Sequence, residues 1–155
     1  MTAPKTEASG CVFCTAAATT DPAATLTLFA NELLVVLLNR FPYTNGHIMV
    51  APRAHVSRLF ESDSAALSAI MLAAAGAQRI LSETYRPDGF NIGMNFGEAA
   101  GAGIADHYHV HVVPRWSGDS NFMSVTAETR MIPEDLEVTW TRLRSKFADL
   151  ESTFS

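Results

Sequence analysis

The distribution of apolar residues along the chain predicts a series of short strands. The segment Phe90–Phe96 alternates apolar residues with Asn or Gly, which is typical of a strand with one buried face. Leu33–Leu38 is instead an unbroken apolar run, so it predicts a strand buried on both faces, and a turn at Asn31-Glu32 precedes it. Strands are predicted, in chain order, over residues 26–29, 33–38, 47–51, 90–96, 107–113 and, as a short one, 122–125.

Two further segments carry apolar residues at intervals of three and four, the spacing of an amphipathic helix. The first begins near Ser62 or Ser64, either of which could cap it, and ends before Pro87 and Gly89. The second begins at Pro133. The apolar positions are Leu67, Ile70, Met71, Ala74, Ala77, Leu81 and Tyr85 in the first helix, and Leu136, Trp140, Leu143, Phe147 and Leu150 in the second. The pattern predicts an α+β fold, an antiparallel sheet with two helices on it.

Length and composition limit the classes of protein to which the chain can belong. It has 155 residues, 48% apolar and 17% charged, which fits one globular domain with its own core. We expect residues 1–10 to be a disordered leader and residues 11–155 to form a single domain. The net charge of −5 argues against electrostatic binding to nucleic acid or to an anionic membrane. A cytoplasmic location is expected, because the first ten residues lack an apolar signal core and no apolar run is long enough to span a membrane.

Three of the five histidines occupy alternate positions, His107, His109 and His111. Alternation places them on one face of the predicted strand, with the residues between them pointing into the core. Imidazole is a neutral metal ligand or nucleophile near pH 7 and a cation when protonated. The three histidines therefore indicate either a metal site or a site that handles phosphate.

The two cysteines, Cys11 and Cys14, form a C-x-x-C pair. Such a pair offers a redox dithiol, half of a tetrahedral metal site or a local disulfide. A disulfide framework is excluded, because a bridge between near neighbours closes almost no loop. No predicted strand precedes the pair, whereas a thioredoxin-like motif would need one. A metal site, a redox role and no function at all stay open on these residues alone.

The segment HYHVHVV resembles the histidine-triad signature of nucleotide hydrolases and transferases. The resemblance runs from CVFC through LLNRFPYTNGHIMVAPRAH and NIGMNFGEAAGAGIADHYHVHVVPRW to GDSNFM. It is strongest to the bacterial branch of diadenosine-polyphosphate hydrolases and phosphorylases, in which Pro-Arg-Trp and Gly-Asp-x-Asn-Phe follow the triad. The resemblance implies a five-stranded antiparallel sheet with two helices, continued across a homodimer. It also implies an enzyme that cleaves a nucleoside polyphosphate, most simply diadenosine tetraphosphate, at an α-phosphate.

The resemblance implies roles for particular residues. His109 would attack the α-phosphorus and form a nucleotidyl-histidine intermediate, which water or an inorganic oxyanion then resolves. His111 and His47 would contact the phosphates and stabilise the charge of the transition state. Asn39 would bind the ribose hydroxyls, since an amide offers both a donor and an acceptor. The alternative interpretation is that Asn39 is a simple turn residue after the strand.

Other candidate binding residues lie in the loop before the triad and just after it. Asn95 is on the polar face of its predicted strand, and the backbone N–H groups near Gly103 and Ile104 can approach phosphate oxygens. Many relatives carry a hydroxyl or amide side chain in this loop, and this chain does not. Trp116 then becomes a candidate hydrogen-bond donor, and the space left by the absent side chain favours the binding of an incoming phosphate. Phosphorolysis to ADP and ATP is therefore favoured over hydrolysis of dinucleoside polyphosphates or adenosine phosphoramidates to AMP.

In zinc-containing relatives, two cysteines and two histidines bind the metal. The matching residues here are Cys11, Cys14, His55 and His107, a closed set that would hold zinc for structure. No organic cofactor is expected, and the expected partners are a nucleotide substrate and a second copy of the chain.

Three other functions remain to be tested. In a metallohydrolase all three triad histidines would bind a catalytic metal, but their spacing on one strand is too wide for a single ion. A nucleotide-binding scaffold without activity would not need His109. A redox protein would use Cys11 and Cys14 as a dithiol.

Overall fold

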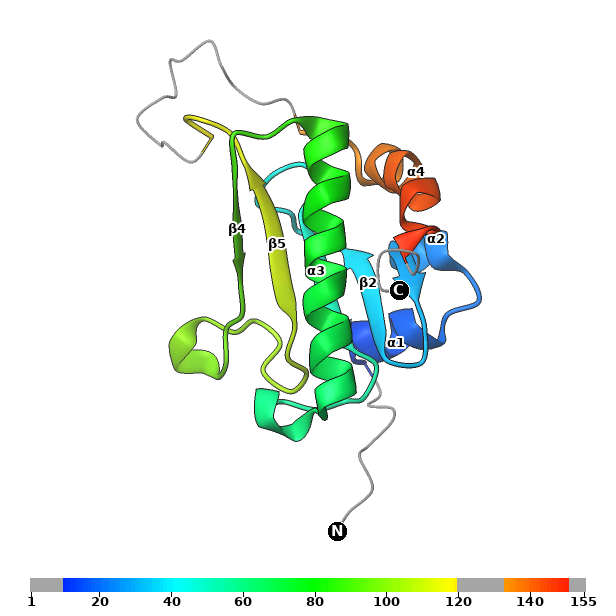
Figure 1. Cartoon of the computed structure of the whole chain (residues 1–155), viewed down its shortest axis with the longest axis vertical. Coiled ribbons are helices and arrows are strands. Elements are labelled where there is room, and N and C mark those ends of the chain that lie inside the picture. The colour runs from blue at the N-terminus through cyan, green and yellow to red at the C-terminus, as the bar shows by residue number, and fades with distance from the viewer. Residues whose placement is uncertain (1–9, 120–132, 151–155) are drawn as a thin grey trace.

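The computed structural model describes residues 10–119 and 133–150 and centres on one five-stranded antiparallel sheet (Figure 1). The strands are β1 (Thr27–Ala30), β2 (Leu34–Leu38), β3 (Ile48–Pro52), β4 (Gly89–Gly93) and β5 (Val110–Arg115). Their order across the sheet is β1-β2-β3-β5-β4, and every neighbouring pair is antiparallel. The predicted α+β class and the five-stranded antiparallel sheet are confirmed.

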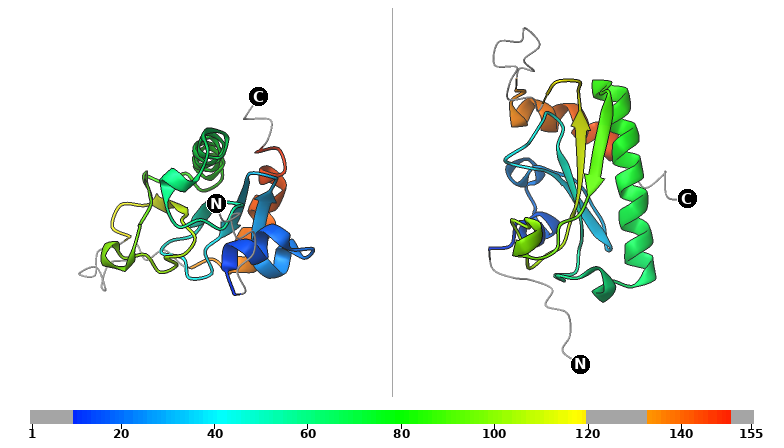
Figure 2. Two further views of the ribbon diagram at one scale, coloured as in Figure 1. Left: turned by 90° about the horizontal axis from the view of Figure 1, so that it is seen from below. Right: turned by 90° about the vertical axis from the view of Figure 1, so that its left-hand side faces the viewer.

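Helices cover both faces of this sheet. The long helix α3 lies along one face, and the N-terminal helix α1 lies on the other, as the right-hand view of Figure 2 shows. Helix α4 packs against β1 and α3. The helices are α1 (Val12–Ala18), α2 (Pro22–Thr25), α3 (Ser64–Tyr85) and α4 (Leu136–Phe147), with 3-10 turns η1 (Leu59–Glu61) and η2 (Glu98–Ala100).

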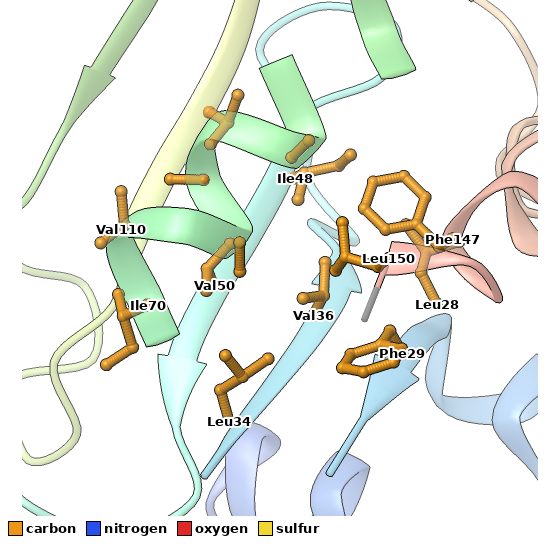
Figure 3. Packing of buried hydrophobic residues seen from close by; sticks show 14 of the residues in the cluster. Leu28, Phe29, Leu34, Val36, Ile48, Val50, Ile70, Val110, Phe147 and Leu150 are labelled. Carbon is orange, nitrogen blue, oxygen red and sulfur yellow. The ribbon is translucent and has the colours of Figure 1, made fainter. Parts of the chain in front are cut away.

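The sheet separates two apolar clusters, and β2 contributes to both. Leu34, Val36 and Leu38 face the larger cluster beneath α3, part of which is drawn in Figure 3. Val35 and Leu37 face the smaller cluster beneath α1. Each of these five side chains is at most 2% exposed, which explains why the strand is apolar at every position. The prediction of a strand buried on both faces is confirmed.

Helices α1 and α2 were not predicted from the sequence. Helix α1 has no side-chain cap at Cys11 and is only seven residues long, so it carries few of the usual signals. Helix α2 does carry one: Asp21 accepts a hydrogen bond from the Ala24 N–H at 3.4 Å, and Pro22 occupies the first turn. The Asp-Pro pair could have revealed α2, whereas α1 depends on its packing against the sheet.

The ends of the two predicted helices also differ from the sequence prediction. Helix α3 is capped by Asp63, whose carboxylate accepts from the Ala66 N–H at 2.8 Å, and not by Ser62 or Ser64. Ser62 instead shares a hydrogen bond with the Tyr108 hydroxyl. Helix α4 begins at Leu136, three residues after the predicted Pro133, because the Asp135 carboxylate caps it.

Two strands have one end three residues away from the predicted position. Strand β5 begins at Val110 and not at residue 107, because the Tyr108 N–H donates to the carbonyl of Val56 (2.9 Å) and not to a neighbouring strand. Strand β4 ends at Gly93 and not at Phe96. The predicted short strand 122–125 and most of the predicted N-terminal leader lie outside the described residues.

Helix α3 is long and apolar enough to pass for a membrane span on length and hydropathy alone. One side of it is nevertheless buried against the sheet. The buried residues are Ala69, Ile70, Ala73, Ala74, Gly76, Ala77 and Leu81.

Candidate active site and metal-binding cluster

All five histidines gather on the side of the sheet that α1 covers. Val110 and Val112 are in the cluster beneath α3, so His111 between them points to the α1 side. His107 and His109 precede the strand but keep the same direction, because Tyr108 between them is buried in the α3 cluster. The predicted alternation therefore holds for the side chains although the strand itself begins later.

The first group of histidines joins the two cysteines at the start of α1. The Sγ of Cys11 lies 3.4 Å from His107 Nδ1, and the Sγ of Cys14 lies 3.4 Å from His55 Nδ1 and 3.7 Å from His107 Nδ1. The two Nδ1 atoms are 3.2 Å apart. All four ligand atoms lie within 4.8 Å of one another, so these residues could hold a metal ion. The structure thus brings together the four residues predicted to bind metal.

Hydrogen bonding fixes the ring orientation of His107. Its Nε2 lies 2.7 Å from the carbonyl oxygen of Pro52, so Nε2 carries the proton and donates it. The Nδ1 lone pair then faces the cysteines, which is the arrangement that metal-binding histidines adopt. Burial, with the neighbouring His55 and His109, lowers the pKa of His107 to about 4, against the opposing effect of the Pro52 carbonyl. Burial also raises the pKa of the Cys11 thiol, so a cation bound there must displace a proton.

His109 is held by its own backbone neighbour and by α1. Its Nδ1 lies 3.0 Å from the carbonyl oxygen of His107, so Nδ1 is the protonated nitrogen and Nε2 carries the lone pair. The ring of Phe13, from α1, lies 4.7 Å from the His109 ring and 5.1 Å from the His107 ring. Burial lowers the pKa of His109, which favours the neutral imidazole. Neutral imidazole with a free Nε2 is the nucleophilic form.

His47 and His111 form the second group, a chain of hydrogen bonds. The Tyr43 N–H donates to His47 Nδ1 at 3.2 Å, so His47 carries its proton on Nε2. That Nε2 lies 2.8 Å from His111 Nδ1 and donates to it, which leaves the proton of His111 on its own Nε2. Burial and the neighbouring histidines lower the pKa of each to about 4. Both rings are therefore neutral near pH 7, and His111 presents an N–H donor beside His109, 4.7 Å between ring centroids.

A pocket of about 680 Å³ opens in front of His109 and His111. Its volume is typical of a site for a small molecule. Its apolar walls come from α1, β2 and β3, through Val12, Leu37 and Met49. Four predicted binding residues also line it, namely Asn39, Asn95, Gly103 and Ile104. His47 is not among the lining residues, and it reaches the site through its bond to His111.

Asn39 takes part in a local turn as well as in the pocket. Its Oδ1 accepts the N–H of Phe41 at 2.9 Å, so a ligand would meet its NH2 group as a donor. The two interpretations of Asn39, as a turn residue and as a binding residue, are therefore compatible. One side chain can serve both purposes.

Trp116 is not among the residues that line the pocket in the described part of the chain. Trp116 follows the far end of β5, five residues beyond His111, which corresponds to about 16 Å along a strand. Its backbone N–H donates to Asp119 Oδ2 at 2.9 Å, and the two residues form a turn that Arg115 closes by an ion pair with Asp119 at 2.7 Å. Spacing in the sequence alone did not reveal that the strand carries Trp116 away from the triad.

Sequence reasoning also missed residues that contact the histidines or line the pocket. Phe13 was not recognised, because its role depends on the unpredicted α1. Phe41 and Tyr43 both line the pocket, and they lie in the RFPYTNGH segment that supplies Asn39 and His47. Their position between two candidate residues was the available signal.

Comparison with known proteins now identifies the class to which this fold and site belong. The family model "HIT domain" matches residues 22–118, and the chain belongs to this family. A curated relative, the AP-4-A phosphorylase of Mycobacterium tuberculosis, is 38% identical over 123 residues. The match covers 79% of this chain and 63% of that protein, so the chain matches less than two thirds of its length.

Solved structures agree with the fold. A Zn-bound histidine triad family protein from Mycobacterium smegmatis is 30% identical, with a TM-score of 0.70, and the match covers 92% of this chain and 96% of that one. A second curated relative, Protein hit of Bacillus subtilis, is 30% identical over 132 residues, and the match covers 84% of this chain and 89% of that protein. The chain is thus similar to nucleotide-processing enzymes of the HIT family.

Proposed function

We propose that this protein cleaves dinucleoside polyphosphates, with diadenosine tetraphosphate as the representative substrate, at an α-phosphate through a covalent intermediate on His109. One observation carries the proposal: the Nε2 lone pair of His109 is fixed by the bond from Nδ1 to the His107 carbonyl, and His109 lines the pocket. The similarity to the AP-4-A phosphorylase supports the choice of substrate.

The first step forms a bond between His109 Nε2 and the α-phosphorus while the bond from phosphorus to the bridging oxygen breaks. ATP leaves with both electrons of that bond. The imidazole becomes a cation, and its Nδ1–H still donates to the His107 carbonyl, which stabilises the positive charge. His111 donates its Nε2–H toward the phosphate oxygens, where negative charge accumulates.

The second step transfers the nucleotidyl group from His109 to an acceptor. We favour orthophosphate over water. Asn95 and Gly103 line the pocket without adding negative charge, and the Gly103-Ile104 pair brings no hydroxyl or amide side chain. Orthophosphate would yield ADP, whereas water would yield AMP. The position of Trp116 removes one donor from this argument, and the similarity to a phosphorylase adds support.

The test is incubation of the purified protein with diadenosine tetraphosphate, with and without millimolar phosphate. Products are separated by chromatography, and protein denatured at alkaline pH, where the P–N bond is stable, is examined by mass spectrometry for AMP on His109. ADP together with ATP supports phosphorolysis. AMP at every phosphate concentration supports hydrolysis in its place, and an absence of cleavage contradicts the proposed function.

We also propose that Cys11, Cys14, His55 and His107 bind zinc. Zinc in a tetrahedral site, with bonds of about 2.3 Å to sulfur and 2.0–2.1 Å to nitrogen, spaces its ligands by about 3.5 Å for S···N and about 3.3 Å for N···N. The distances of 3.4, 3.4, 3.7 and 3.2 Å match these values. Four protein ligands would close the site, so the metal would tie α1 to the histidine segment and would not activate water.

A further inference from the structure

Two large aromatic side chains stand exposed at the edge of the pocket. Phe41 is 80% exposed and Tyr43 is 71% exposed, and both line the pocket together with His109 and His111. Neither belongs to the apolar clusters on the two sides of the sheet. Large aromatic groups held in water contribute little to folding, so their position calls for another explanation.

The backbone that carries these rings is firmly attached on both sides. The Phe41 N–H donates to Asn39 Oδ1, and the Tyr43 N–H donates to His47 Nδ1. Just beyond, the Thr44 hydroxyl donates to the Pro114 carbonyl at 2.7 Å. The intervening Pro42 has a fixed φ. The two aromatic rings are therefore presented on an ordered segment tied to the residues of the candidate active site.

The ring of Tyr43 extends the row of catalytic rings outward. It lies 4.5 Å from the His47 ring and 6.2 Å from the His111 ring, with only 24° between the planes of Tyr43 and His111. A flat group stacked on Tyr43 would therefore lie beside His111, where a phosphate chain that passes His111 could connect to it. Val12, Leu37 and Asn39 line the same pocket, and a first nucleoside bound against them would leave Phe41 and Tyr43 free for a second one.

From this arrangement we infer that Phe41 and Tyr43 form a stacking site for the second base of a dinucleoside polyphosphate. The inference rests on the proposed function and deepens it, because it assigns the leaving half of the substrate to a place in the structure. Nucleobases fit such a site since every base has a flat π face, and stacking on aromatic side chains is tolerant of base identity. The site would make the enzyme prefer substrates that carry a nucleoside at both ends.

The test compares two substrates that share one chain of phosphates. Diadenosine tetraphosphate has a second base, and adenosine 5′-tetraphosphate does not. In wild-type protein we expect the lower KM for diadenosine tetraphosphate. In the Phe41→Ala variant, the KM for diadenosine tetraphosphate divided by the KM for adenosine 5′-tetraphosphate should rise about tenfold. This corresponds to the loss of one stacking contact. Phe41→Trp should restore the wild-type ratio.

Phe60→Ala is the matched control, because Phe60 is 85% exposed in η1 and does not line the pocket. It should leave the ratio as in the wild type. Equal effects of Phe41→Ala on both substrates, or no effect on either, would overturn the stacking site while the proposed function stands. Failure of the wild type to cleave either substrate would overturn both. Thermal melting of each variant shows whether a lost activity reflects unfolding.

Discussion

The candidate active site uses one residue type in different chemical states, and each state follows from a neighbouring atom. His109 carries its proton on Nδ1, because Nδ1–H donates to the His107 carbonyl, and its Nε2 therefore carries the lone pair. His111 has the opposite tautomer, because His47 donates to its Nδ1. The sequence predicted which histidines would meet, but the tautomers depend on backbone atoms that side-chain patterns do not reveal.

Replacing His109 with alanine should abolish turnover with little effect on binding. The nucleophile lowers the barrier more than it contributes to ground-state affinity, so kcat should fall by about 1000-fold or more. The Kd for diadenosine tetraphosphate, measured by calorimetry, should change by less than about threefold. His111→Ala should reduce kcat less, because the backbone N–H groups of the loop share its role. A His109→Ala variant that keeps substantial activity would contradict covalent catalysis.

The His47–His111 pair should make the folded state sensitive to acid. The pKa of each is about 4 in the folded protein, below the usual 6.5, so the unfolded chain binds more protons between these values. Their contribution to stability is complete above pH 6.5 and is lost as pH falls toward 4. Urea unfolding at several pH values should show this decline, and the His47→Gln, His111→Gln double variant should show a shallower one. Identical slopes would contradict the assignment.

At the scale of elements, sequence reasoning succeeded where an element carries its own apolar pattern. Helices α3 and α4 were found because their apolar residues repeat regularly, and strand β2 was found because it is an unbroken apolar run. Helix α1 was missed because it is short, uncapped and stabilised by tertiary contacts of Phe13 and the cysteines. The four cluster residues were found through the family resemblance, although the helix that presents the cysteines was not.

Because α1 is short, its attachment should depend on the metal. We expect about one zinc per chain by elemental analysis of protein purified without chelator. Cys14→Ser should release the zinc and lower Tm, since the binding energy of a closed site is also folding energy. Thr15→Ala, an exposed neighbour on α1, is the control and should retain the metal. Freshly purified protein without metal would contradict the zinc assignment.

A polar network joins the end of α3 to the start of α4. Glu134 accepts hydrogen bonds from the Tyr85 hydroxyl at 2.5 Å and the Thr139 hydroxyl at 2.7 Å, and it pairs with Arg142 at 3.2 Å. Burial and the Glu134 carboxylate raise the pKa of Tyr85, so the phenol stays a donor. The backbone N–H of Glu134 donates to Asn45 Oδ1 at 2.8 Å, and Asn45 lies two residues before His47. The network therefore connects α4 to the segment that carries His47.

Glu134→Ala should lower the free energy of unfolding by about 1–3 kcal/mol, because it removes the carboxylate acceptor of the part-buried Tyr85 hydroxyl and leaves the Thr139 hydroxyl with only the Asp135 carbonyl at 3.2 Å. Urea denaturation measures the change. Glu137→Ala is the control, since Glu137 is exposed on the first turn of α4. Equal stability of the two variants would show that the network contributes nothing.

At the scale of the whole molecule, the sheet ends in an open edge. Strand β4 pairs only with β5 among the described residues, and its last three residues, including Ile92, are exposed. A strand with free backbone groups on one side can pair with another chain. This supports the expectation of a homodimer with a continuous sheet, which remains our proposal.

Sedimentation should give about twice the 16.8 kDa of one chain. Ile92→Glu should shift the equilibrium toward monomer, because it sets like charges against each other across the edge. Val138→Glu, on the exposed face of α4, should not. A wild-type protein that sediments as a monomer would contradict the proposal.

The bond from His109 to the carbonyl of residue 107 has a consequence for how this architecture can change over time. Every amino acid supplies a main-chain oxygen, so the reactive tautomer does not require histidine at position 107. The cluster that we propose to bind zinc and the proposed nucleophile are neighbours, yet their chemical requirements are separate. A lineage could exchange Cys11, Cys14, His55 and His107 for apolar side chains that fill the same space and still inherit a working nucleophile.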